Sequence, residues 1–394
     1  MVPRIMAKTF KQLLAETKGQ VPEISAEDVK KRIDAKDGTT VLDIREKDET
    51  TQGHLPSTTL LPRGFLELRV EEKFPDKTKP VIVYCAGGTR SLLAARALKE
   101  LGYEQVSSMA GGFNKWKELG YPFVVPQALD AAMRRRYDRH LVIPEVGEEG
   151  QLKLVNAKVL LIGAGGLGSP IGIYLAAAGI GTIGIIDSDV VDESNLQRQI
   201  LHTTASVGTP KVDSAERAIL ALNPHVKVRK FHERLTSENV MRIFDGFDVV
   251  VDGSDNFATR YLVNDACVLK KIPNVHGSIF RFEGQVTVFA PNLGGPCYRC
   301  LYAEPPPPDL APNCNDAGVL GVLPGIVGLL EATETIKLIL GKGRTLVGRM
   351  VALDALETTF REFKLRRDPE CAMCSDSAVF KGFIDYDEFC AARA

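Results

Sequence analysis

The stretch K-V-L-L-I-G-A-G-G-L-G, residues 158–168, decides the fold of the larger part of this chain. Its apolar first half is typical of a buried strand, and its glycines allow a tight turn into a helix predicted over residues 169–178. Downstream, Asp187 ends the apolar run I-G-I-I-D, at a position where a carboxylate binds a ribose hydroxyl. The pattern predicts a Rossmann-like nucleotide site formed by Gly163, Gly165, Gly166, Gly168 and Asp187.

The glycine pattern alone does not choose between NAD and ATP, but the residues after it favour ATP. The segment S-N-L-Q-R-Q places Asn195, Arg198 and Gln199 at i, i+3 and i+4, which predicts one face of a helix. Lys211 follows a Gly/Pro turn and precedes another predicted helix. A triphosphate that loses pyrophosphate needs several cations along its leaving group. Arg198 and Lys211 meet that need, although ordinary solvated surface charge would leave the same pattern.

A third strand, D-V-V-V-D, is followed by G-S-D-N and so by Asp255. This places Asp255 at the carboxyl end of the predicted parallel sheet, where ligands bind in such folds. A carboxylate in that position is suited to Mg²⁺, and the alternative is an aspartate that caps a turn.

Four cysteines lie at metal-binding spacing, in C-Y-R-C and C-A-M-C. A gap of two residues lets both sulfurs of a pair reach one ion, so the two pairs predict a tetrahedral Zn²⁺ site. The pairs are too far apart for a zinc ribbon, and we expect a structural clamp that ties the end of the chain to the domain. Two unrelated pairs or redox dithiols are the alternative. The predicted ligands are Cys297, Cys300, Cys371 and Cys374.

An earlier segment also alternates strand and helix signals, with strands predicted over residues 40–44 and 80–85. Cys85 ends the second strand and is followed by A-G-G-T-R-S, after which a helix is predicted over residues 91–101. A helix N-terminus and the nearby Arg90 lower the pKa of a thiol, and the glycines let backbone N–H groups surround an anion. Four residues separate Cys85 from Arg90, against five in tyrosine phosphatases, so the tighter loop suits a thiolate or persulfide.

The length of 394 residues and these two alternating segments predict two α/β domains, over residues 20–125 and 126–394. The Pro-bounded piece Y-P-F-V-V-P-Q joins them, and an amphipathic helix predicted over residues 130–141 opens the second. Lys and Arg number 49 against 50 Asp and Glu, so nothing indicates nucleic-acid binding. No apolar run reaches the roughly 18 residues of a membrane span. Eight cysteines without a disulfide framework suggest a reducing, cytoplasmic location.

The first segment resembles the rhodanese (sulfurtransferase) family over about residues 21–123. The shared motifs are the loop from Cys85 to Arg90, D-I-R at residues 43–45, G-H-L-P at 53–56 and M-A-G-G-F-N-K-W at 109–116. The resemblance implies that Cys85 carries a persulfide and that Arg90 helps to bind the donor. It also implies that Asp43 and Arg45 support the loop. Ser57 stands where the family often has Gly, and an inactive docking module is the alternative.

The second segment is similar to the MoeB/ThiF family, bacterial relatives of ubiquitin-activating enzymes. The shared motifs are R-Y-D-R-H, G-A-G-G-L-G, D-S-D, S-N-L-Q-R-Q, P-K, S-D-N, C-Y-R-C, G-V-L-G and the last C-x-x-C. The resemblance implies adenylation, with Mg-ATP, of the C-terminal glycine of a ubiquitin-fold sulfur carrier protein that ends in Gly-Gly. The implied ATP-binding residues are the glycine loop, Asp187, Asp189, Asn195, Arg198, Gln199 and Lys211. Asp255 would support Mg²⁺ and the acyl attack, and Arg139 would reach across a homodimer.

Cys314 lies in the Pro-rich stretch E-P-P-P-P-D-L-A-P-N-C-N, which matches the crossover loop of related enzymes. There a cysteine can join the activated carrier covalently or relay sulfur to it, and the alternative is an exposed thiol without a role. Cys267 lies in an apolar helical run and is expected in the core.

With both segments on one chain, the expected product is a carrier thiocarboxylate, made with sulfur from a persulfide donor such as a cysteine desulfurase. The carrier could serve molybdenum cofactor (molybdopterin), thiamine, cysteine or tRNA-thiolation chemistry. Two other classes stay open at this point. One is an NAD(P)-linked oxidoreductase with an attached rhodanese, and the other is a zinc-clamped docking scaffold without turnover.

Overall fold

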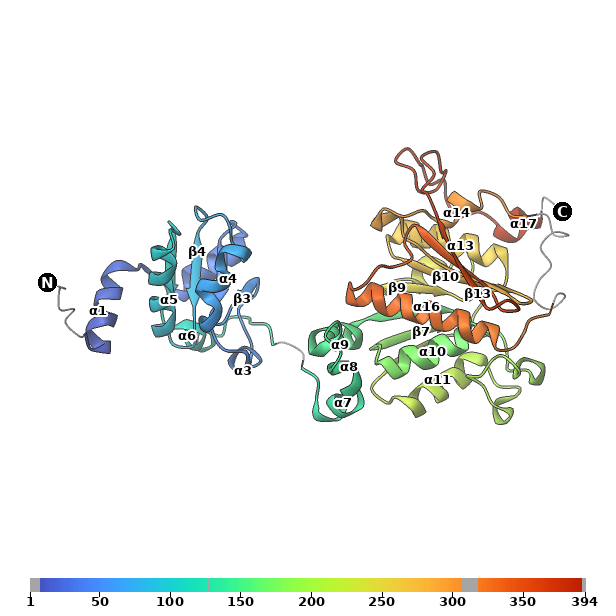
Figure 1. Ribbon diagram of the computed structural model, residues 1–394, viewed down its shortest axis with the longest axis horizontal. Helices are drawn as coiled ribbons and strands as arrows, with labels where there is room; N and C mark the ends of the chain where they lie inside the picture. Colours follow the sequence, from blue (N-terminus) through green and yellow to red (C-terminus); the bar gives the residue numbers. More distant parts are fainter. Residues whose placement is uncertain (1–7, 126–127, 307–317, 392–394) are drawn as a thin grey trace. The chain divides into compact units, whose positions relative to one another are not determined.

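The computed structural model describes residues 8–125, 128–306 and 318–391. The chain divides between residues 128 and 129 into two compact units, which are described separately below (Figure 1). Among the described helices, none combines the length and the apolar character that crossing a membrane requires.

The smaller unit is built on a five-stranded sheet in which every pair of neighbours is parallel, in the order β1-β5-β4-β2-β3. The central strand is buried on both faces. Val81 and Val83 enter one apolar cluster, whereas Ile82 and Tyr84 enter another, as the two-residue period of a strand requires. The strands are β1 (Glu23–Ile24), β2 (Thr40–Asp43), β3 (Thr58–Leu60), β4 (Val81–Tyr84) and β5 (Val106–Met109).

Helices cover this sheet, and two of its predicted supports are in place. Arg45 is buried and donates from Nη2 to the Asp43 carboxylate at 2.6 Å and to the Gly53 carbonyl at 2.7 Å. Ser57 has a φ of 55°, in the left-handed region that favours glycine. The helices are α1 (Phe10–Gln20), α2 (Ala26–Ala35), α3 (Lys47–Thr50), η1 (Arg63–Phe65), α4 (Leu66–Lys73), α5 (Thr89–Glu100) and α6 (Gly112–Glu118).

The larger unit holds an eight-stranded sheet in the order β13-β12-β11-β10-β9-β6-β7-β8. The strands from β8 to β10 are parallel, and β11 to β13 extend the sheet in antiparallel fashion. This confirms the predicted α/β architecture with a mostly parallel sheet. The strands are β6 (Lys158–Ile162), β7 (Thr182–Ile186), β8 (Lys227–Phe231), β9 (Val249–Asp252), β10 (Asn274–Phe280), β11 (Glu283–Phe289), β12 (Arg349–Asp354) and β13 (Thr359–Lys364).

Both faces of this sheet are covered, so β6 is buried on both sides. Val159 and Leu161 pack toward α10, α11 and α16, and Leu160 and Ile162 pack toward α12 and α13 (Figure 1). The helical elements are α7 (Ala131–Arg136), α8 (Asp138–Leu141), α9 (Gly147–Asn156), α10 (Gly168–Ala178), η2 (Glu193–Asn195), η3 (Thr204–Ser206), α11 (Lys211–Leu222), α12 (Val240–Ile243), α13 (Phe257–Lys270), η4 (Pro291–Leu293), α14 (Tyr298–Leu301), α16 (Leu323–Leu340) and α17 (Tyr386–Ala391).

One predicted helix contains a break, and another predicted helix is absent. The helix expected over residues 130–141 breaks at Tyr137, whose ring is buried against Gly179 and whose hydroxyl accepts a hydrogen bond from Asn223 at 2.9 Å. The segment with Asn195, Arg198 and Gln199 is not an α-helix: a short 3-10 turn ends at Asn195, and turns follow it. A bond from the Gln199 N–H to the Asn195 carbonyl at 2.9 Å still keeps one helical turn in this region.

Candidate functional sites

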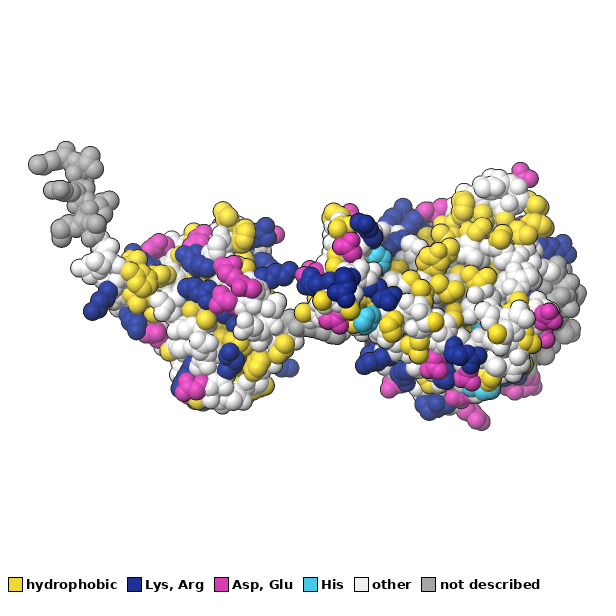
Figure 2. Space-filling view, turned by 90° about the horizontal axis from the view of Figure 1, so that it is seen from below, with side chains coloured by type: hydrophobic (Ala, Val, Ile, Leu, Met, Phe, Trp, Pro, Cys, Tyr) yellow, Lys and Arg dark blue, Asp and Glu magenta, His cyan; other side chains and the backbone are white. Residues whose placement is uncertain are grey.

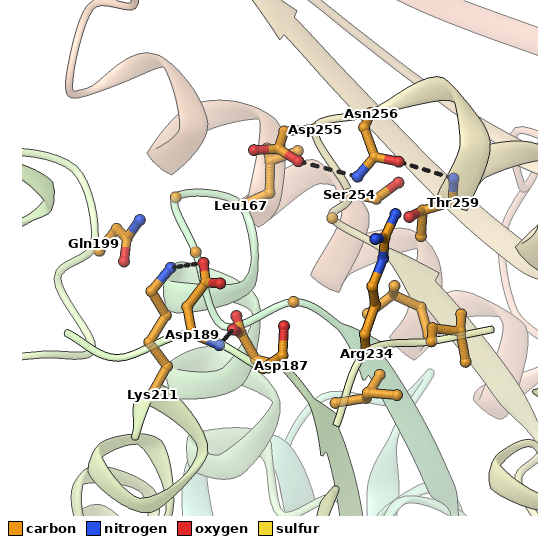
Figure 3. A pocket seen from close by; sticks show the side chains of 18 of the residues that line it. Leu167, Asp187, Asp189, Gln199, Lys211, Arg234, Ser254, Asp255, Asn256 and Thr259 are labelled. Carbon is orange, nitrogen blue, oxygen red and sulfur yellow. Dashed lines mark hydrogen bonds and ion pairs between the residues drawn. The ribbon is translucent and has the colours of Figure 1, made fainter. Parts of the chain in front are cut away.

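A hollow opens where β6, β7 and β9 end, and it encloses about 1170 Å³ including the solvent at its mouth. Figure 3 shows side chains from several separate segments converging on it. The predicted nucleotide-site residues that line it are Gly163, Gly165, Gly166, Asp187, Asp189, Arg198, Gln199, Lys211 and Asp255. The hollow thus brings most of the predicted site together.

The glycine loop needs its glycines for reasons visible in the backbone. Gly163 has a φ of 90°, which side chains rarely adopt. A Cβ on Gly168 would lie 2.1 Å from the Gly163 carbonyl oxygen, so Gly168 closes the turn into α10 without lining the hollow. Both positions therefore fix the tight strand-to-helix turn that lets phosphates approach backbone N–H groups.

Asp187 is held in place by the backbone on both sides. Its carboxylate accepts hydrogen bonds from the N–H group of Ala164 at 2.9 Å and from that of Asp189 at 2.8 Å, of which Figure 3 shows the second. Each carboxylate oxygen has a further lone pair. The group is thus oriented toward the hollow and can still accept from a sugar hydroxyl.

Lys211, the first residue of α11, donates from Nζ to the Asp189 carboxylate at 2.8 Å (Figure 3). Arg198 is half-buried at the same wall, where the aliphatic part of its side chain lies beside Gly166. Gln199 is buried, and its Oε1 has no hydrogen-bond partner among the described residues. The wall therefore offers two cations and an unsatisfied amide to a ligand.

Asp255 is exposed at the other side of the hollow and accepts a 3.3 Å hydrogen bond from Asn256 Nδ2. Asn256 is the N-cap of α13, because its Oδ1 accepts from the N–H of Thr259 at 2.9 Å. The cap fixes the loop that presents Asp255 (Figure 3).

Two arginines that line the hollow were missed by sequence reasoning. Arg260 lies one helical turn after Asn256 in α13, so helix periodicity could have found it. Arg234 follows β8 in a loop with no motif, and it pairs with Asp387 of α17 at 2.8 Å. Nothing in its local sequence reveals that contact.

A buried histidine supports the glycine loop from behind. His202 Nε2 lies 2.9 Å from the Ala164 carbonyl oxygen, and its Nδ1 lies 2.9 Å from the Ser214 hydroxyl of α11. Burial lowers the pKa of His202, so the ring is neutral at neutral pH. The ring connects the glycine loop to the helix that carries Lys211.

In the smaller unit, the Cys85 thiol is buried at the end of β4 inside the predicted loop. Its Sγ accepts from the Gly88 N–H at 3.2 Å and lies 3.6 Å from the Ser91 hydroxyl. A Cβ on Gly112 would lie 2.3 Å from the Cys85 carbonyl oxygen, which explains the glycines of the M-A-G-G motif. The loop thus directs the Gly88 N–H at the sulfur, whereas the Ser91 hydroxyl accepts from the thiol and donates to the Gly88 carbonyl oxygen at 2.9 Å.

The four predicted ligand cysteines come together, with all their sulfurs within 4.8 Å of one another. Three of the separations are 3.6 Å (Cys297–Cys371), 3.9 Å (Cys297–Cys300) and 3.4 Å (Cys300–Cys374). Sulfurs at tetrahedral corners about 2.3 Å from a zinc ion lie roughly 3.8 Å apart. The cluster therefore fits a tetrahedral metal.

Side chains next to the cluster tie it to the rest of the unit. Arg299, between the first two cysteines, makes two 2.8 Å hydrogen bonds to Asp265 of α13. Asp265 also accepts from the hydroxyl of Tyr386, the first residue of α17, at 2.7 Å. The cysteine cluster, α13 and the last helix are thus joined through one carboxylate.

Four predicted residues lie elsewhere. Asn195, the last residue of η2, is half-buried and does not line the hollow. The Arg139 side chain is 93% exposed and does not line the hollow of its own unit. In Figure 2, basic side chains gather over the first helices of the larger unit, where the arginine-rich run is. Cys314 lies outside the described residues. Cys267 is buried in α13, as expected, and burial raises its pKa well above the ordinary value.

Comparisons with known proteins agree with the division of the chain into two units. Residues 137–373 match the ThiF family and residues 25–119 match the rhodanese-like domain. The chain is 50% identical over 262 residues to a Thermus thermophilus protein named sulfur carrier protein adenylyltransferase, covering 66% of this chain and 97% of that one. It is 50% identical over 260 residues to "Adenylyltransferase and sulfurtransferase MOCS3" of Aedes aegypti, covering 66% of this chain. That match spans 59% of the mosquito protein's length.

Among solved structures, the E. coli protein MccB with ATP has a TM-score of 0.54 at 24% identity, covering 61% of this chain and 74% of that one. This likeness shows the fold. The fold and the two sites define a two-domain α/β protein that combines a Rossmann-type nucleotide hollow with a single-cysteine anion loop. The chain belongs to the ThiF family and carries an N-terminal rhodanese-like domain.

Proposed function

We propose that the larger unit adenylates the C-terminal glycine of a ubiquitin-fold sulfur carrier protein, and that the smaller unit supplies the sulfur that replaces AMP. The observation that carries the proposal is the hollow, which gathers a glycine loop, Asp187, two cationic side chains and Asp255. The name of the mosquito relative gives both activities, and the name of the Thermus relative gives adenylation of a sulfur carrier protein. Neither the oxidoreductase nor the docking scaffold gains support from these relatives.

In the proposed first step, a carboxylate oxygen of the carrier attacks the α-phosphorus of ATP. The bond between the α-phosphorus and the bridging oxygen breaks, and pyrophosphate leaves with the electron pair. Lys211 and Arg198 stabilise the charge that builds on the leaving group. Asp187 orients the ribose, and Asp255 would hold Mg²⁺, which neutralises phosphate charge when it is bound.

In the proposed second step, the terminal sulfur of a Cys85 persulfide attacks the acyl carbon and AMP leaves. The product is an acyl disulfide between the carrier and Cys85. A second thiol must then attack the Cys85 sulfur, which releases the carrier thiocarboxylate and leaves a disulfide on Cys85. Cys314 is one candidate for that thiol, and a small dithiol can serve in its place.

Two finer assignments belong to the same proposal. The four-cysteine cluster would hold Zn²⁺ as a structural ion, because thiolate sulfurs at these separations suit it and none of them lines the hollow. Arg139 would act in the hollow of a second copy of the chain, in a homodimer, because it is exposed and lies outside its own hollow.

The proposal is tested with ATP, a carrier ending in Gly-Gly, a persulfide donor and dithiothreitol. We expect carrier-dependent exchange of pyrophosphate into ATP, and a carrier mass higher by about 16 because sulfur replaces oxygen. Cys85→Ala should keep the exchange and lose the mass gain. Cys390→Ser, which changes a half-buried thiol outside both sites, is the control and should keep both. Exchange without a mass gain in the wild type would refute the sulfur step alone.

A further inference from the structure

The arginine of the sulfur loop is already bound by a carboxylate of its own domain. Arg90 donates from Nη1 and Nη2 to the two oxygens of Glu49, at 2.7 Å and 2.5 Å. Glu49 comes from α3, 41 residues earlier in the chain, so the pair is a product of the fold. The Glu49 side chain is 29% exposed and that of Arg90 is 40% exposed, so water and ligands reach both.

The ion pair shifts the pKa of each partner in the direction expected for a tight ion pair. The hydrogen bond to Arg90 lowers the pKa of Glu49, and the hydrogen bond to Glu49 raises the pKa of Arg90. Interaction with Cys85 raises the pKa of Arg90 in the same direction, so the guanidinium that Glu49 binds also faces the sulfur loop. An anion that approaches Cys85 therefore meets a cation that is already neutralised.

We infer that Glu49 determines the class of sulfur donor that the Cys85 loop accepts. A small free oxyanion such as thiosulfate must displace Glu49 from Arg90. The displaced carboxylate then lies close to the negative charge of the oxyanion, and the two repel each other. A persulfide that arrives beside a positive group, on a basic protein surface or on a zwitterionic small molecule, offers Glu49 a new partner. The loop thus favours cation-bearing persulfides over free oxyanions. This inference rests on the proposed role of Cys85 as the sulfur acceptor.

The test is Glu49→Gln, which removes the charge but keeps an oxygen for the hydrogen bond that Glu49 accepts from the Glu46 N–H. The reaction is sulfur transfer from thiosulfate to Cys85 with release of sulfite, followed by transfer to cyanide as thiocyanate. We expect the KM for thiosulfate to fall about fivefold to tenfold with little change in kcat, since a partly exposed pair has a modest energy. For cysteine persulfide, which carries its own ammonium group, the kcat/KM of Glu49→Gln should not rise above that of the wild type.

Asp48→Asn is the matched control, because Asp48 is an exposed residue of the same helix and the substitution changes the net charge equally. Asp48→Asn should leave the KM and kcat for both donors unchanged. Glu49→Ala gives up the Glu46 contact as well, and it should show the same KM shift with a lower melting temperature. An unchanged KM for thiosulfate in Glu49→Gln, or an equal gain for both donors, would overturn the inference. If wild-type Cys85 gains no sulfur from either donor by intact mass, the proposed function fails instead.

Discussion

At the scale of single residues, Lys211 shows how a buried cation is paired inside the hollow. Its side chain is only 7% exposed, yet it binds Asp189, whose side chain is 65% exposed. A buried ammonium needs a partner, and Asp189 provides one that water and ligands can reach. Because the Asp189 side chain is more exposed than that of Glu49, at 65% against 29%, water can solvate its carboxylate when phosphate oxygens replace it on Lys211.

Asp255 provides the first prediction at this scale. Asp255→Ala should lower carrier-dependent pyrophosphate exchange by at least about 100-fold, because it removes the carboxylate placed to hold the metal and to support attack. Asp245→Asn changes an exposed aspartate that pairs with Lys270, outside the hollow, and should leave the exchange unchanged. Full exchange in Asp255→Ala would remove this residue from the mechanism.

Glu331 provides a prediction about pH. This residue of α16 is fully buried, neither of its carboxylate oxygens has a hydrogen-bond partner among the described residues, and burial raises its pKa well above the ordinary 4.5. The folded state therefore holds a proton that the unfolded chain releases above pH 4.5. This group lowers the free energy of unfolding as pH rises, by up to about 1.4 kcal/mol per pH unit, until the folded pKa is passed.

Glu331→Gln removes that titration. The free energy of unfolding of the variant, minus that of the wild type, should rise between pH 5 and pH 8 in urea denaturation. Glu357→Gln, at an exposed position, is the control and should give a difference that does not change with pH. A flat difference for Glu331→Gln would mean that the buried carboxyl does not titrate as the structure indicates.

Sequence reasoning recovered the residues whose positions follow from a strand-to-helix turn, such as Gly163, Asp187 and Asp255. These residues lie within a few positions of a strand end, so local patterns locate them. Arg234 could not be found this way, because its partner Asp387 lies 153 residues further along the chain. The Glu49–Arg90 pair could not be predicted for the same reason, since only the fold brings α3 to the loop.

At the scale of elements, the break in the helix predicted over residues 130–141 has a tertiary cause. The run D-A-A-M-R-R-R-Y-D-R-H-L has a helical pattern, but Tyr137 is anchored by Gly179 and Asn223 from distant segments. The break then follows from packing, which propensity does not record. The strands β4, β6 and β9 were predictable because strands buried on both faces are continuous apolar runs.

The cysteine cluster gives the prediction at this scale. Cys371→Ser should lower both the metal content and the melting temperature, because a structural zinc ion contributes its binding free energy to folding. Elemental analysis and thermal unfolding measure the two quantities, and Cys390→Ser serves as the matched thiol control. Freshly purified wild-type protein without zinc would contradict this assignment.

At the scale of the whole molecule, Arg139 provides a test of whether each active site needs residues from two copies of the chain. In a homodimer with shared sites, Arg139→Ala and Asp255→Ala should each be inactive, and a mixture whose subunits exchange should recover part of the exchange activity. Some heterodimers then keep one intact site. Arg135→Ala, an exposed arginine of the preceding helix, is the control and should stay active alone. A monomer by light scattering at assay concentrations would exclude this arrangement.

The last helix of the chain has a practical consequence for anyone who handles this protein. Tyr386 fastens α17 to Asp265, and Asp387 holds Arg234 at the rim of the nucleotide hollow. Shortening the chain after Cys374, a usual step toward better crystals, would remove both contacts and release an arginine beside the bound nucleotide. Nucleotide affinities measured on chains shortened in this way would therefore describe an altered pocket.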